Sequence, residues 1–168
     1  MPSDYSALAQ IFKPVPTDLV AYFDRIADGS LSSHFEIELN LLPPNRAAEL
    51  TMQFLEFHPI VQALHGFVLD DGNTSDHHIY LARAPLAGAV LFLAHDDDSR
   101  VVYPSLSEFV SAAQAAKEQD RGFSDIHPPR SPVAPDQAAL SEFIRQQLDM
   151  KMEQMSSRLS FLRWISVI

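Results

Sequence analysis

The sequence has 168 residues, of which 46% are hydrophobic, so it can form one domain, or one domain with an appendage, around a substantial core. Its 22 acidic and 12 basic residues give a formal net charge of −10, which repels nucleic acid and anionic membranes and suits a basic partner. The absence of cysteine excludes disulfides and thiolate chemistry, and with no recognisable signal peptide or bilayer-spanning run we expect a cytoplasmic protein.

The first third of the sequence predicts two helices, a strand and a further helix. Apolar spacing indicates a helix over 4–12, which "KPVP" ends, and then a helix that Thr17 caps and Gly29 terminates. The stretch "HFEIELNLL" alternates apolar and polar residues over 34–42, which predicts a half-buried strand. The segment "PPNRAAELTMQFLEF" begins with prolines and predicts a helix that ends at Pro59, followed by a short turn of helix.

The middle of the sequence predicts an antiparallel meander. "GFVLDDGNTSDHHIYLA" and "GAVLFLAHDDDSRVVYPS" each indicate a strand, a polar turn and a strand, and their two turns are expected at the same end of the sheet. Ser105 and Glu108 then form a capping-box pattern that opens a helix through Lys117. The expected fold is α+β, with an antiparallel sheet of four to six strands flanked by helices.

The last third predicts a linker and a long helix. "DRGFSDIHPPRSPVAP" is rich in proline, and after it apolar residues recur at helical spacing to the end of the sequence. We therefore expect three parts: an α+β domain over 1–118, a linker over 119–135 and a C-terminal amphipathic helix over 136–168. That helix can pack on its own domain or on a second copy of the chain, and the sequence leaves both open.

Histidines and aspartates in the two hairpins raise the question of a metal or catalytic site. "DDGNTSDHHIYL" lacks the glycine position and final glutamate of an EF-hand loop. His77 and His78 are adjacent, so on a strand they point to opposite faces and cannot ligate one ion together. A small metal-dependent hydrolase that uses one of them with His95 stays as a third hypothesis. The sequence favours solvated turns, and we expect no cofactor and no metal.

Several stretches resemble the SUKH superfamily. They are "PVPTDLVAYFDRIADGS", "FEIELNLLP", "GFVLDDG", "HHIYL" and above all "GAVLFLAHDDD" followed by "VVYPSLSEFV". The last two align Gly88, the turn 96–98, Ser105 and Phe109 with the family's pattern, and the resemblance covers 14–116. The family's Asn-Gly after the first helix is Asp28-Gly29 here. The segment 46–64 and the C-terminal helix fall outside the pattern.

The resemblance implies a non-enzymatic bacterial α+β domain, often an immunity protein that neutralises a toxin, commonly a nuclease, by binding it. An acidic face fits that task because nuclease active sites are basic. The candidate partner-binding residues are Asp70, Asp71, Asp76, Asp96, Asp97, Asp98, Glu36 and Glu38. The alternative function is a regulatory or structural module that forms a homodimer through the C-terminal helix.

Overall fold

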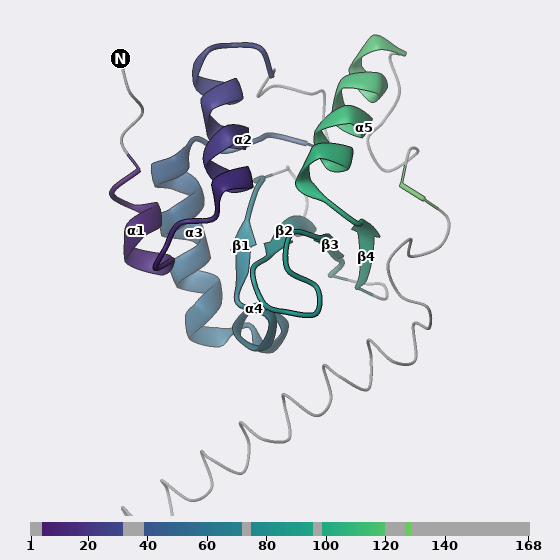
Figure 1. The fold of residues 1–168 in the computed structure, drawn as a ribbon. Helices are drawn as coiled ribbons and strands as arrows, with labels where there is room; N and C mark the ends of the chain where they lie inside the picture. The colour runs from purple at the N-terminus through teal and green to yellow at the C-terminus, as the bar shows by residue number, and fades with distance from the viewer. Residues whose placement is uncertain (1–4, 32–38, 72–74, 96–98, 120–126, 129–168) are drawn as a thin grey trace, which may run out of the picture.

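The computed structural model describes residues 5–31, 39–71, 75–95, 99–119 and 127–128. These ranges hold five helices and a four-stranded antiparallel sheet, so the α+β prediction is confirmed (Figure 1). The helices are α1 (Leu8–Ile11), α2 (Thr17–Ala27), α3 (Pro44–Phe57), α4 (Pro59–Leu64) and α5 (Leu106–Glu118). The strands are β1 (Gly66–Val68), β2 (His77–Leu81), β3 (Val90–Leu93) and β4 (Arg100–Tyr103). The predicted C-terminal helix over 136–168 lies outside the described residues.

The ends of α2 and α5 follow from local side-chain chemistry. Ser105 precedes α5, and its Oγ accepts the backbone N–H of Glu108 at 3.2 Å, which confirms the predicted cap. Gly29 follows α2 with φ of 78°, a conformation that glycine adopts without strain, so this predicted helix end is also confirmed. The predicted cap at Thr17 is wrong, because Thr17 is the first helical residue and Pro16 takes the cap position.

The predicted strand over 34–42 is only partly described. Leu41 forms an isolated antiparallel bridge with Asp70, and both Leu39 and Leu41 are buried, as the alternation predicts. Residues 34–38 lie outside the described ranges. The helix α3 begins and ends as expected, with Pro44 in its first turn and Pro59 beginning the next short helix.

The sheet is the predicted meander, with strand order β1-β2-β3-β4 and antiparallel pairing throughout. The register pairs His78 with Phe92, and Phe92 with Arg100, so these three residues form one row across three strands. The β1–β2 and β3–β4 connections leave from the same end of the sheet, as predicted. This row lies next to that end.

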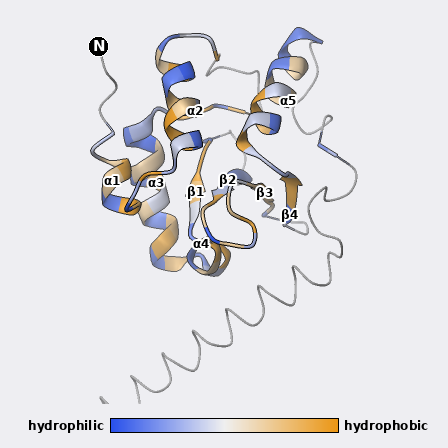
Figure 2. Ribbon diagram, in the orientation of Figure 1, coloured by the Kyte–Doolittle hydropathy of each residue, from blue (hydrophilic) through white to orange (hydrophobic). Residues whose placement is uncertain are grey.

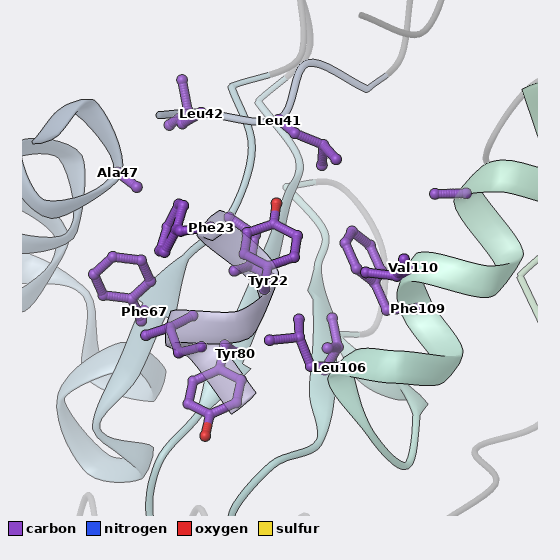
Figure 3. Close-up of a cluster of buried hydrophobic side chains, with 14 of the residues drawn as sticks. Tyr22, Phe23, Leu41, Leu42, Ala47, Phe67, Tyr80, Leu106, Phe109 and Val110 are labelled. Atoms are coloured by element: carbon purple, nitrogen blue, oxygen red, sulfur yellow. The ribbon is translucent and has the colours of Figure 1, made fainter. Parts of the chain in front are cut away.

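Alternation along the strands sends side chains to two covered faces. Figure 2 shows hydrophobic residues along the strands and on the helices around them. One face packs under α1, α2 and α5 and is rich in aromatic rings; we call it the α2/α5 face (Figure 3). The other packs against α4 and the second half of α3, and we call it the α3/α4 face. The α2/α5 face includes Phe67, Tyr80, Val102, Tyr22, Phe23 and Phe109; the α3/α4 face includes Val68, Ile79, Leu81, Leu91, Leu93 and Val101.

Candidate functional site

The two hairpin connections meet at one end of the sheet, which we call the acidic end. Asp76 in the first connection accepts the backbone N–H of His95 in the second, with 2.7 Å between Oδ1 and N. Asp71 is exposed and Asp76 is partly exposed. Asp96–Asp98 follow His95 directly in the sequence but lie outside the described residues. The hairpin contact therefore confirms that the two turns share one end of the sheet.

Basic residues are placed differently from these acids. Arg83 belongs to the β2–β3 connection at the opposite end of the sheet, where its Nη1 donates to the carbonyl oxygen of Ala63 at 3.0 Å. Arg100 begins β4 beside the acidic end, but it is half-buried and donates to the carbonyl oxygen of Pro128. The charges along the meander are therefore separated, with the exposed acids at one end.

Asp70 does not belong to the exposed set, which corrects the prediction that it faces a partner. Its exposed fraction is 1%. Oδ1 accepts the backbone N–H of His78 at 2.6 Å, and Oδ2 lies 2.8 Å from Nδ1 of the same histidine. Because a buried carboxylate is costly without such partners, these two contacts explain why an aspartate is tolerated under the hairpin.

His77 and His78 point to opposite faces, as their adjacency predicted. The His77 ring lies 5.0 Å from the Phe54 ring of α3, and its Nδ1 lies 3.1 Å from the carbonyl oxygen of Asp70. The His78 ring lies 5.2 Å from the Phe109 ring of α5. The two imidazoles therefore cannot share an ion. Among the described residues, no group of three or more histidine, aspartate or glutamate side chains is placed to hold a metal ion.

His127 completes a polar network that the sequence did not indicate. Its Nε2 lies 2.9 Å from Nε2 of His78, and its ring packs against the Phe92 ring in a tilted arrangement with 4.7 Å between ring centroids. We call Asp70, His78 and His127 the histidine network. Burial lowers the pKa of His127 to about 3, and the neighbouring His78 and Arg100 lower it in the same direction. Where its ring is packed against the sheet, His127 is therefore disfavoured in its charged form.

Two tyrosines, Tyr22 and Tyr103, belong to the same buried cluster on the α2/α5 face. Tyr22 is a buried residue of α2, and Figure 3 shows its hydroxyl on the side of the ring toward Leu41. Burial raises the pKa of Tyr22 well above its usual value, and the Asp70 carboxylate raises it further. Burial also raises the pKa of Tyr103 to about 12, against the opposing effect of Arg100. Both phenols are neutral at physiological pH, so the titratable chemistry here rests with the histidines.

The remaining predicted residues are not placed together by the described structure. Glu36 and Glu38 lie outside the described residues, as do Asp96, Asp97 and Asp98. Sequence reasoning missed His127 because it lies in a proline-rich segment, 49 positions from His78. The sequence offers only a histidine within a proline-rich linker, and this does not identify its contact with His78.

Comparison with known proteins adds no family to this description. No family model matches the sequence, and no curated protein or solved structure matches it either. The resemblance to the SUKH superfamily stays a prediction. Within the part of the chain that the structure describes, no helix has the length and apolar character needed to cross a bilayer.

Proposed function

We propose that the chain is a protein-binding domain whose acidic end of the sheet meets a basic partner, as an immunity protein does when it occludes a toxin domain. The observation that carries the proposal is the joining of two acidic hairpin connections through Asp76 and the His95 N–H. Besides the buried Asp70, the segments 71–76 and 95–98 contain five aspartates and no lysine or arginine. Such a concentration of one charge on turns accelerates encounter with a surface of the opposite charge.

Within this end, Asp71 and Asp76 are the described residues best placed to contact a partner. Asp71 is exposed and Asp76 is partly exposed, whereas Asp70 is buried and bonded to His78. A partner that covers the turns would desolvate exposed carboxylates and pair them with its own lysines or arginines. The expected effect of these charges is mainly on the association rate and its salt dependence.

The test is a capture experiment from the native cell lysate with matched charge variants. The site variant carries Asp71→Asn and Asp76→Asn, and asparagine at position 76 retains an oxygen that accepts the His95 N–H. The control carries Glu56→Gln and Glu118→Gln, which remove the same charge from exposed positions on α3 and α5. Captured proteins are identified by mass spectrometry at low and at moderate salt.

We expect the wild type and the control to retain one basic protein at low salt and to lose it at moderate salt. With the purified partner, the site variant should associate about tenfold more slowly. Equal association rates for site and control variants would remove the acidic end from the interface. Self-association through residues 136–168 stays the alternative, and a defined oligomer that captures no partner would favour it.

A further inference from the structure

The contacts of residues 127–128 show a short segment fastened to the sheet at three points. His127 Nε2 meets His78 Nε2, the His127 ring packs on Phe92, and Arg100 donates to the carbonyl oxygen of Pro128. The three receiving residues are the row across β2, β3 and β4 that the strand register defines. The segment is therefore docked on the α2/α5 face, directly beside the acidic end.

The geometry of the two imidazoles limits how many protons they can hold. The Asp70 carboxylate accepts from Nδ1–H of His78, so Nε2 is the nitrogen of His78 that faces His127. At 2.9 Å the two Nε2 atoms are joined by one N–H, donated by either ring. If both Nε2 atoms carry a proton, two N–H groups point at each other and the hydrogen bond is lost.

We propose that the histidine network is an acid-sensitive latch, which holds residues 127–128 on the sheet when the two Nε2 atoms share one proton and releases them when both Nε2 atoms carry one. The charged and titratable groups around it are Asp70 from the connection after β1, His78 from β2, and Arg100 and Tyr103 from β4. Arg100 and His78 both oppose a positive charge on His127. Release moves a charged His127 away from His78 and Arg100 and lets water solvate it.

The sign of the pH dependence follows from the lowered pKa of His127. Its closed-state pKa of about 3 lies below the ordinary value of 6.5, so the open state binds protons more readily. The latch is fully effective above pH 6.5 and weakens as the pH falls toward 3. The ratio of open to closed molecules rises by up to about tenfold per pH unit in this window, or about fiftyfold between pH 6.5 and 4.5.

The experiment follows the full chain by NMR between pH 7.5 and 4.5. Nuclear Overhauser contacts between the residue-127 side chain and the Phe92 ring report the closed latch. Contacts between His65 and Phe12, whose rings lie 5.2 Å apart, report the integrity of the domain. In the wild type we expect the first contact to fade on acidification while the second persists.

Two variants separate proton chemistry from packing. His127→Gln keeps an N–H donor for His78 but does not titrate, so its contact with Phe92 should be independent of pH. His127→Ala should lack the docked state at every pH, while the remaining spectrum stays dispersed. A wild-type contact that survives to pH 4.5, or a His127→Gln contact that fades as in the wild type, would overturn the latch.

One equivalent of Zn²⁺ at pH 7.5 provides a further discriminating measurement. We expect no stoichiometric change in the ring signals, because a metal needs more than the two described nitrogens. Stoichiometric shifts of both His78 and His127 would replace the latch with a metal bridge.

Discussion

The two faces of the sheet are covered by different kinds of side chain. The α3/α4 face is filled largely by aliphatic side chains such as Ile79, Leu81 and Leu91, which need only shape and apolar area to pack. The α2/α5 face carries aromatic rings and, at its acidic end, the histidine network. Strand β2 contributes a histidine to each face, because His77 and His78 are neighbours and point in opposite directions. Both faces therefore carry a buried histidine, but only on the α2/α5 face does the histidine bond to a carboxylate and to a second imidazole.

The largest effect is expected from Asp70→Ala, which breaks the polar network at its buried end. The change removes the acceptor of the His78 N–H and the partner of its ring nitrogen. Breaking a buried, hydrogen-bonded pair costs about 3–5 kcal/mol of unfolding free energy. Urea denaturation measures it, and Asp71→Ala, one residue on and exposed, should stay within about 0.5 kcal/mol. Equal losses would mean that Asp70 is not held as described.

A cavity on the aliphatic face should cost somewhat less. Leu91 is fully buried among apolar side chains, so Leu91→Ala should lower the unfolding free energy by about 2–4 kcal/mol through lost burial and a residual cavity. Leu91→Met conserves volume and should lose less than about 1.5 kcal/mol. The same denaturation experiment measures both, and an alanine variant as stable as the methionine variant would contradict close packing of this face.

Removal of a single buried hydroxyl, that of Thr51 on α3, should lower the unfolding free energy by a smaller amount. Thr51 of α3 is fully buried, and its Oγ1 accepts the backbone N–H of Val68 at 2.9 Å. Thr51→Val leaves that N–H without its acceptor and should cost about 1–3 kcal/mol. Thr51→Ser retains the hydroxyl, so it should recover part of the loss. If serine and valine destabilise equally, the hydrogen bond contributes nothing measurable.

The smallest effect concerns the helix that covers the aromatic face. Ser105→Ala removes the oxygen that caps α5 and should cost about 1 kcal/mol, seen as a lower thermal midpoint. Ser111 lies on an exposed position of the same helix, and its hydroxyl donates to the carbonyl oxygen of Ser107 in the preceding turn. Ser111→Ala should change stability by less than about 0.5 kcal/mol. A reversed order would show that α5 is stabilised by packing alone.

Much of this fold could be predicted because its signals are local. Prolines and Ser105 mark helix starts, Gly29 marks a helix end, and the meander follows from polar turns between apolar runs. The opposite directions of His77 and His78 follow from the period of two in a strand. The Thr17 cap was wrong because a helix can begin one residue earlier than its best capping side chain suggests.

The candidate site could be predicted only in part, because its inner half depends on contacts distant in sequence. Asp70 and Asp71 look alike in the sequence, yet only Asp70 lies opposite the start of β2, where His78 satisfies its carboxylate. The location of His127 depends on where a proline-rich segment returns to the sheet, and no local pattern specifies that return. The location of the two turns at one end of the sheet could be predicted, because alternate turns of an antiparallel meander lie at the same end.

The central claim is that Asp70, His78 and His127 form one continuous network, and the nitrogen spectrum of the imidazole rings at pH 7.5 tests it most directly. The account predicts a protonated Nδ1 on His78, bonded to Asp70, and one proton shared between the two Nε2 atoms. His127 should stay uncharged well below pH 6.5 while the domain remains folded. A bare Nδ1 on His78, or a His127 that titrates near 6.5 with no response from His78, would contradict the network.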